Sequence, residues 1–483
     1  MNILGDSLPR RFKAKASGSI TAGKPLIVKS DGDVTQISAT GGGPSVGPLF
    51  EADYPIAYNG PHAVYDTGND KVVMAGGDID SGRLAVFVGT VSGETITFGS
   101  KQEAGDDPLV ENVALTFDPD SGKVIMAYRD RSNSNYATAR VITVSGSTAS
   151  IGTATVFLSA AGSDKQMTYD TNANKVVIAV RNNSQSQNGY GYVGTVSGTS
   201  ISFGSGTAFT TTGTCDNIGV TFDSSNNKVV VVYQDNAASH GMSVVGTVSG
   251  TSISFGTPVT INAASTSELC CSFDATNNKV VVFYKDGGNS GYGTAIVGTV
   301  SGTSISYGTE VVFESNSVVL AAGFQSSVFD PDNSLITISY SFTGGGGCFK
   351  AGTVSGTSIT FGDKLVFEPG DIYYPESCYD PDTDRVVTVY VDAGRSNYFT
   401  AAVIKTVSSN LTSENYIGIA EYAAADTETA TVLIKGGVST IQSSLTPGQT
   451  YFVQGDGTLA LTADDPSVTA GTAVTSTKLI VKG

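Results

Sequence analysis

Short apolar runs alternate along most of this chain with polar turns rich in Asp, Asn, Ser and Gly. In one segment of this kind the runs are Leu269 to Phe273, Val280 to Tyr284 and Thr294 to Val300. Runs of this length, rich in β-branched and aromatic residues and bounded by turn residues, predict β-strands. A Ser-Gly turn then leads into a fourth predicted strand, residues 304–313. The second run is apolar at every position, so both of its faces must be covered.

The same pattern recurs at intervals of about fifty residues. Each copy opens its polar turn with an aromatic residue followed by Asp, and Thr-Val-Ser-Gly recurs in phase with these pairs. We number the repeats 1 to 7 by the aromatic-Asp pairs, which are Tyr65-Asp66, Phe117-Asp118, Tyr169-Asp170, Phe222-Asp223, Phe273-Asp274, Phe329-Asp330 and Tyr379-Asp380. Repeats of this length with several strands each are typical of β-propellers. The sequence therefore predicts an all-β fold, a seven-bladed β-propeller of four-stranded blades.

The last repeat indicates how the ring closes. Repeat 7 runs through its third strand, residues 399–407, and then leaves the pattern. Residues 47–54 parallel residues 364–371, which precede the seventh aromatic-Asp pair, so residues 46–52 are predicted to supply the missing outer strand. Pairing of the first and last repeats removes exposed strand edges. The propeller is thus predicted over residues 43–409.

The segments outside the repeats, residues 1–42 and 410–483, resemble each other. Residues 19–32 align with residues 444–457, and both segments predict two strands joined by a turn, with an Asp-Gly hairpin signal. Because ring closure brings the two flanks near each other, we predict one small β domain built from both ends of the chain. The propeller is then an insertion in that domain.

The C-terminal segment resembles a module of tailed-bacteriophage virion proteins, which include tail fibres, tail-associated proteins and head appendages. The resemblance covers roughly the last 70 residues, and extends to the first 40, in the stretches 413–420 (SENYIGIA), 445–459 (LTPGQTYFVQGDGTL), 470–473 (AGTA) and 478–482 (KLIVK). It implies a virion structural protein that folds in the host cytoplasm. Such a protein would dock to other virion proteins through the small β domain and be present as a homo-oligomer or in several copies on the particle.

The composition of the chain limits the kinds of binding partner that it can have. A net charge of −17 argues against nucleic acid and against anionic membrane surfaces. Arg10, Arg11 and Lys13 have no apolar run behind them, so no secretory signal is predicted, and no apolar stretch is long enough to span a bilayer. The five cysteines are odd in number and lack metal-like spacing, which favours buried free thiols.

No cofactor, metal or catalytic site is predicted. His62 and His240 are the only histidines, and they lie in different repeats. Aspartates of the polar turns, such as Asp118 and Asp120, are better explained as turn-forming groups than as calcium ligands. Paired carboxylates for glycoside hydrolysis are the enzymatic alternative, because the sequence does not show which acids converge.

The loops at the two ends of a four-stranded blade differ. The first-to-second and third-to-fourth turns lie at one end and are nearly uniform; we name it the Asp-turn end. The second-to-third loops lie at the other, the variable-loop end, and differ in length and character. Uniformity suits a scaffold, whereas divergence suits recognition, although drift or packing against neighbouring subunits gives the same pattern.

Side chains at the variable-loop end include groups that stack on sugars or hydrogen-bond to them. The candidate ligand-binding residues are Arg131, Tyr136, Tyr190, Tyr192, Tyr292, Arg395 and Tyr398, each with the alternative of an ordinary loop or strand-edge residue. The favoured function is a tail fibre or tail-associated protein that presents the propeller to a host-surface glycan or a neighbouring subunit. The alternatives are a head-decorating protein of the capsid, a glycan-degrading propeller enzyme and, last, a bacterial surface adhesin, which would normally need an export signal.

Overall fold

The computed structural model describes residues 10–29, 31–38, 43–78, 82–106, 108–210, 214–320, 326–395, 397–407, 409–464 and 466–482, without the side chains of residues 53–59. This part of the chain is all-β, and its helical segments are two 3-10 turns, Gly287–Asn289 (η1) and Ala393–Arg395 (η2). The described residues hold no helix of the length and apolarity needed to cross a membrane. Two compact units result: a terminal unit, Met1–Gly43 with Val407–Gly483, and a repeat unit, Pro44–Thr406.

The terminal unit contains two sheets. The first has the order β1-β37-β36-β2-β3, with strands Arg11–Lys15, Thr429–Leu433, Tyr416–Ala420, Pro25–Val28 and Val34–Gln36. The second has the order β38-β42-β41-β39-β40, with strands Val438–Ser439, Lys478–Val481, Val468–Thr475, Thr450–Val453 and Leu459–Ala460. Ile27 and Ile37 share a buried cluster with Leu445, Tyr451 and Val453. The N-terminal segment therefore belongs to the core of this unit.

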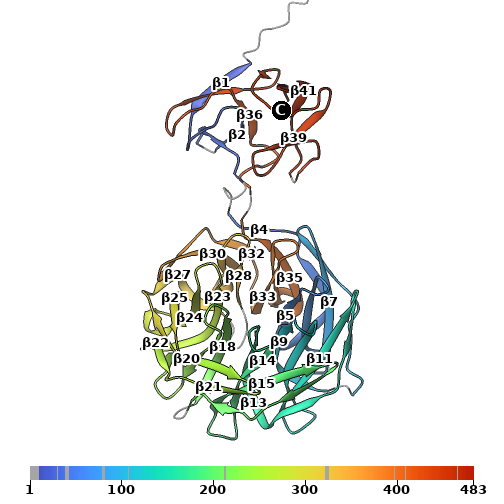
Figure 1. The fold of residues 1–483 in the computed structure, drawn as a ribbon, viewed down its shortest axis with the longest axis vertical. Helices are drawn as coiled ribbons and strands as arrows, with labels where there is room; N and C mark the ends of the chain where they lie inside the picture. The colour runs from blue at the N-terminus through green and yellow to red at the C-terminus, as the bar shows by residue number, and fades with distance from the viewer. Residues whose placement is uncertain are drawn as a thin grey trace, which may run out of the picture. The chain divides into compact units, whose positions relative to one another are not determined.

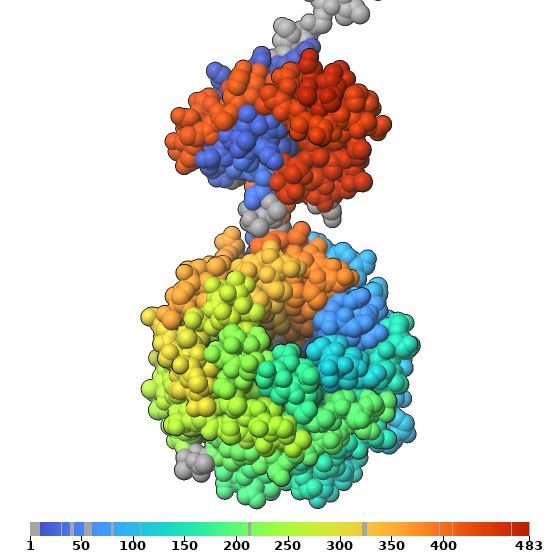
Figure 2. Space-filling view, in the orientation of Figure 1, coloured from blue at the N-terminus to red at the C-terminus, as the bar shows by residue number. Residues whose placement is uncertain are grey.

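Repeat 5 shows how the repeats are built. Strand β23 (Thr266–Asp274) pairs with β24 (Lys279–Asp286), β24 with β25 (Tyr292–Ser301), and β25 with β26 (Ser304–Tyr307), all antiparallel. The outer strand then breaks and resumes as β27 (Val311–Val319), which pairs with β25 and then with β29 of repeat 6. Figure 1 shows the repeats following one another around a ring, and Figure 2 shows a hollow at its centre. The fold of this unit is β-propeller-like.

The other repeats use strands in the same order. Their bounds are Phe50–Asp66, Lys71–Asp78, Leu84–Ser92 and Thr95–Phe98 (β5 to β8); Val110–Asp118, Lys123–Asp130, Tyr136–Ser145 and Thr148–Ile151 (β9 to β12); Thr155–Asp170, Lys175–Asn182, Asn188–Ser197, Ser200–Phe203 and Thr207–Ala208 (β13 to β17); Cys215–Asp223, Lys228–Asp235, His240–Ser249, Ser252–Phe255 and Val259–Asn262 (β18 to β22); Ser327–Asp330, Leu335–Phe342, Gly347–Ser355, Ser358–Phe361 and Leu365–Glu368 (β28 to β32); and Ile372–Asp380, Arg385–Asp392 and Tyr398–Lys405 (β33 to β35).

The first and last repeats share a sheet. Strand β35 pairs with the short strand β4 (Ser45–Val46) and with the start of β5. Phe50 lies opposite Ala401, and Glu51 lies opposite Thr400. These pairs fall within the segments 46–52 and 399–407 that the sequence placed together. The start of β5 is thus the outermost strand beside repeat 7.

Close contact between backbones fixes the spacing of successive repeats. A Cβ added to Gly204, which ends the outer strand of repeat 3, would overlap the carbonyl oxygen of Thr251 in repeat 4. The equivalent Gly47, on the segment beside repeat 7, meets Glu94 of repeat 1 in the same way. Only glycine allows so close an approach. Gly362 of repeat 6 differs, because its nearest neighbour is a carbonyl oxygen of its own repeat, at 3.7 Å.

Apolar side chains fill the space between repeats. Every residue from Val280 to Tyr284 is fully buried, which confirms that both faces of this strand are covered. Val230 and Val232 of repeat 4 belong to the same buried cluster as Val280 and Val282 of repeat 5. The five cysteines are free and buried, as the sequence predicted. Burial of this kind supplies most of the favourable free energy of folding.

Candidate functional site

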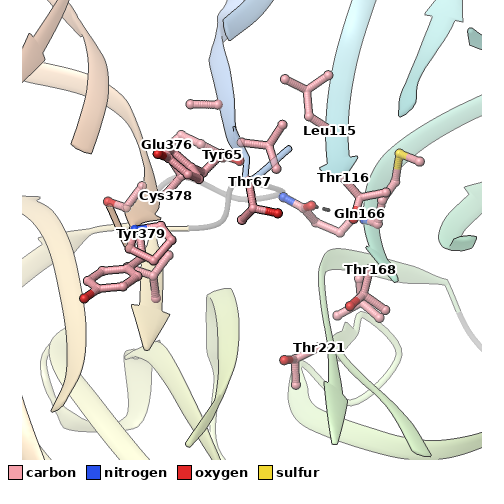
Figure 3. A pocket seen from close by; sticks show the side chains of 17 residues that line it. Tyr65, Thr67, Leu115, Thr116, Gln166, Thr168, Thr221, Glu376, Cys378 and Tyr379 are labelled. Atoms are coloured by element: carbon pink, nitrogen blue, oxygen red, sulfur yellow. Dashed lines mark hydrogen bonds between the residues drawn. The ribbon is translucent and has the colours of Figure 1, made fainter. Parts of the chain in front are cut away.

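The innermost strands of the repeat unit line a cavity of about 380 Å³. Thr67 and Pro381, from turns that follow aromatic-Asp pairs, also line it, so the cavity lies toward the Asp-turn end. Figure 3 shows Gln166 extending from one side toward Thr67, with Glu376 and Tyr379 on the other side. The volume falls in the range typical of small-molecule sites.

A β-bulge near the start of the innermost strand turns particular side chains toward this cavity. In β13 the pairing register shifts between Ser163 and Lys165, and in β33 it shifts between Tyr373 and Glu376. An extra residue in a strand changes the direction of the side chains that follow it. Gln166 and Glu376 each come two residues after the positive-φ residue of the bulge, Asp164 or Tyr374, and both line the cavity. The bulge therefore decides which side chains the cavity receives.

One histidine meets one carboxylate beside the cavity. His62 Nδ1 lies 3.5 Å from Glu376 Oε2, and the two side chains are 2% and 3% exposed. His62 follows Gly60, which has a φ of 76°, by two residues, just as Glu376 follows Tyr374, which has a φ of 55°. Spacing along the sequence showed no partner for His62. The signal that could have paired it with Glu376 is their shared position, three residues before the aromatic residue of the aromatic-Asp pair.

The cavity offers one carboxylate for chemistry. Among the described residues that line it, Glu376 is the sole acidic side chain. Glycoside hydrolysis by the common mechanisms needs two carboxyl groups on opposite sides of the scissile bond. Gln166 can hydrogen-bond a polar guest, but the lining gives no support to the glycan-degrading alternative.

The aspartates of the polar turns are occupied by their own turns. Asp274 accepts hydrogen bonds from the backbone N–H groups of Thr276 and Asn277 and from Asn277 Nδ2, each at 2.9 Å. Asp223 accepts four such bonds from Ser225 and Asn226. The prediction that these residues form turns is confirmed. The described residues contain no group of three or more acidic, His or Cys side chains arranged to hold a metal.

Ion pairs link the second and innermost strands at the variable-loop end of repeats 2 to 5. In each pair a cation near the end of the second strand meets an acid near the start of an innermost strand. The pairs are Arg129–Glu111 at 2.6 Å, Arg131–Glu111 at 3.4 Å, Arg181–Asp164 at 3.0 Å, Arg181–Asp216 and Lys285–Glu268 at 3.4 Å. The Arg181–Asp216 pair joins repeat 3 to repeat 4. This network therefore strengthens the ring.

Lys165 is fully buried within this network. Its Nζ donates a hydrogen bond of 2.7 Å to the carbonyl oxygen of Asn112 in repeat 2. Burial lowers the pKa of Lys165 to about 7, against the attraction of the Asp164 carboxylate. The ammonium charge is thus held at a cost, because taking a charge out of water is unfavourable.

The sequence-predicted residues lie at the variable-loop end but in four different repeats. Arg131 and Tyr136 flank the loop of repeat 2, and Arg395 and Tyr398 flank that of repeat 7. Tyr190 and Tyr292 lie near the starts of β15 and β25, and Tyr192 lies midway along β15. Arg131 pairs with Glu111, and Arg395 Nη2 lies 3.4 Å from Glu51 Oε2. The structure therefore groups these residues by repeat and does not place them on one element.

Tyr192 is corrected to a core residue. It is 7% exposed, and its ring packs edge-on against Phe157, with the ring centroids 5.3 Å apart. Tyr192 lies opposite Ile178, two residues further from the loop than Tyr190. The start of β13, which contains Phe157, pairs with β11 as the outer strand of repeat 2 and covers the ring of Tyr192. The interpretation of Tyr192 as a ligand-facing side chain is therefore wrong.

Repeat 7 carries an aromatic pair that the sequence analysis missed. The ring centroids of Tyr373 and Tyr374, at the start of β33, lie 6.3 Å apart, and Tyr373 is 46% exposed. Ala393 N donates a 3.1 Å hydrogen bond to the carbonyl oxygen of Asp371. This bond holds the turn that contains Arg395 beside the start of β33. The signal in the sequence was an aromatic pair at a position where repeats 2 to 5 have polar residues.

No family model and no curated protein matches this chain. Among solved structures it is similar to a protein from Lactobacillus plantarum, with 11% identity and a TM-score of 0.46, over 77% of this chain and 98% of that one. It is also similar to hydrazine synthase from Kuenenia stuttgartiensis, with 9% identity and a TM-score of 0.48, over 73% of this chain and 96% of that one. Likeness at this level says nothing about what the chain does.

Proposed function

We propose that this chain is a structural protein of a tailed-bacteriophage virion, of the tail-fibre or tail-associated type. The terminal unit docks to other virion proteins. The repeat unit is a seven-bladed propeller, inserted in the terminal unit, that contacts a host-surface glycan or a neighbouring subunit. The resemblance of residues 413–482 to virion modules is the starting point for this proposal.

The proposal rests on the separation of the chain into a terminal unit and a repeat unit. Both ends of the chain contribute to the terminal unit, where β1, β2 and β3 share a sheet with β36 and β37. The repeat unit is consequently an insertion without a free end. The loops of such an insertion can change in sequence without altering the terminal unit, because changes in surface loops leave the strands that they connect intact.

The count of seven blades is supported by the regular joints between repeats. Aromatic-Asp turns occur seven times, and the segment with Gly47 packs on repeat 1 as Gly204 packs on repeat 4. Strand β5 contributes its start to repeat 7 and its end to repeat 1. A ring joined in this way leaves few open strand edges. Because open edges promote aggregation, this suits a protein that is present in many copies on a particle.

Electron microscopy of particles carrying a tagged chain tests the proposal. A short tag fits between Ala237 and Ala238, which are exposed in the variable loop of repeat 4. Gold label at the tail is the expected result. Label spread over the head shell would instead make the chain a head-decorating protein. Absence of label from all particles would overturn the virion proposal.

A further inference from the structure

We infer that Tyr373 and Tyr374, at the variable-loop end of repeat 7, bind a neutral saccharide by stacking against a sugar ring. The inference rests on the proposed function and gives its glycan contact a location and a chemistry. Arg395, held near the start of β33 by the bond between Ala393 and Asp371, lies in the same repeat and can hydrogen-bond to sugar hydroxyls.

The backbone at Tyr374 is the first observation. Its φ of 55° lies in the left-handed region, which is uncommon and strained for a bulky side chain. Among the matching bulge residues that the structure describes, in repeats 1 to 5, Gly60, Asn112, Asp164 and Asn217 suit that conformation better, and Glu268 is the one other long side chain with positive φ. Strain of this kind persists where a side chain is needed for another purpose.

The surroundings of Tyr373 are the second observation. At the equivalent place in repeat 2, Glu111 lies opposite Arg129 and is paired with it. Tyr373 instead lies opposite Val391. Repeat 7 thus has a tyrosine and a valine where repeat 2 has an ion pair, and Tyr373 is 46% exposed. A tyrosine side chain has two torsion angles, so covering its ring with a ligand costs little conformational entropy.

The chemistry of the pair selects the ligand. A tyrosine ring offers an apolar face and a polar tip, and a pyranose ring offers C–H groups on one face and hydroxyls around its edge. A strongly anionic polymer is disfavoured, because the chain carries a net charge of −17. The occupant is therefore a neutral saccharide with an apolar ring face. A neighbouring protein subunit is the competing occupant.

Binding measurements on the full chain test this inference. The wild type is screened on an array of purified bacterial surface polysaccharides and neutral oligosaccharides, and the strongest neutral oligosaccharide is titrated by calorimetry. Tyr373→Ala is expected to weaken binding at least about tenfold. The matched control is Tyr422→Ala, which removes a 62% exposed tyrosine of the terminal unit and is expected to leave the affinity unchanged.

Tyr374→Asn separates a binding role from a structural one. Asn tolerates the left-handed conformation, so the variant is expected to have a Tm at or above that of the wild type while its affinity falls at least about tenfold. A lowered Tm with unchanged affinity would show that Tyr374 is structural and would overturn the inference.

Two outcomes separate this inference from the proposed function. If Tyr373→Ala binds as tightly as the wild type, the saccharide site lies elsewhere, and the proposed function stands without it. If the wild type binds no saccharide on the array, the inference fails together with the glycan contact. Gold label on particles would then leave subunit contact as the task of the variable-loop end.

Discussion

The two ends of the repeat unit make opposite use of the same strands. At the Asp-turn end, a buried aspartate saturated by its own turn recurs, as Asp223 and Asp274 illustrate. The variable-loop end also has such turns, at Asp130, Asp286 and Asp392. Beside them, however, repeat 2 has the ion pair Arg129–Glu111, whereas repeat 7 has Tyr373 opposite Val391. The variable-loop end thus differs from the Asp-turn end in the side chains next to its turns, which change from repeat to repeat.

The comparison teaches where this fold tolerates change. A turn that buries a carboxylate constrains its neighbours, because each lost hydrogen bond leaves a buried polar group unsatisfied. A loop whose groups are partly exposed constrains little, since water replaces what a substitution removes. The Asp-turn end is therefore the scaffold, and the variable-loop end is free to acquire a ligand.

The largest expected effect comes from the joints between repeats. Gly204→Ala drives a methyl group into the backbone of Thr251, and we expect it to lower the free energy of unfolding by about 3 kcal/mol. Gly362→Ala is the matched control, because its nearest neighbour lies 3.7 Å away, and it should cost less than about 1 kcal/mol. Urea denaturation measures both. Equal losses would show that the joints do not set the spacing of the repeats.

A pair of aspartates in repeat 4 compares the two ends directly. Asp223 accepts four hydrogen bonds at the Asp-turn end, whereas Asp235 accepts one, from Ala237 N, at the other end. We expect Asp223→Ala to cost about 2 kcal/mol and Asp235→Ala less than about 1 kcal/mol, because charge-assisted bonds at buried sites are the stronger ones. Chemical denaturation checks the order. The reverse order would contradict the assignment of the scaffold end.

The sequence predicted what local chemistry decides. Asx turns depend on residues two and three positions away, so the aspartate turns were visible in the pattern. The partners of residues 399–407 were visible because residues 47–54 repeat the pattern of residues 364–371. Tyr192 was misplaced because its burial depends on an outer strand from the preceding repeat, which a loop comparison does not include.

The pair Tyr373–Tyr374 escaped prediction because a β-bulge adds one residue to the innermost strand there, so simple alternation counted back from the aromatic-Asp turn assigns these side chains to the wrong face. The register shift between Tyr373 and Glu376 is such a bulge. His62 and Glu376 lie between the bulge and the turn, and they escaped prediction because they belong to repeats 1 and 7, at opposite ends of the repeat series. Alignment of the repeats on their aromatic-Asp pairs would have shown that His62 and Glu376 stand at the same position, three residues before the aromatic residue.

The pH dependence of stability tests the ion-pair network at the variable-loop end. Lys165 has a pKa of about 7 in the folded protein, against 10.5 for an ordinary lysine side chain in water. Between these pH values the unfolded chain binds more protons, so the contribution of Lys165 makes stability rise with pH, by at most about 1.4 kcal/mol per unit. Urea denaturation at several pH values from 7 to 10 should show this rise, and Lys165→Met should remove it. A wild type and a Lys165→Met variant whose stabilities change equally with pH would contradict the burial of this charge.

The smallest effect is expected from two partly exposed arginines. Arg131→Ala removes a partly exposed ion pair with Glu111, and Arg395→Ala removes one with Glu51. Each should change the free energy of unfolding by less than about 1 kcal/mol, because water screens such pairs. Thermal denaturation measures both. A loss as large as that of Asp223→Ala would remove the difference between the two ends.

Hydroxyl-radical footprinting tests the central claim, that recognition belongs to the variable-loop end and scaffolding to the Asp-turn end. The full chain is oxidised with and without the strongest neutral oligosaccharide from the array, and the modification of each tyrosine is measured by mass spectrometry. The account predicts protection of Tyr373 and Tyr374, with unchanged modification of Tyr65 and Tyr379, which line the cavity toward the Asp-turn end. Protection of Tyr65 and Tyr379, with Tyr373 unchanged, would place the ligand in the cavity and contradict the account.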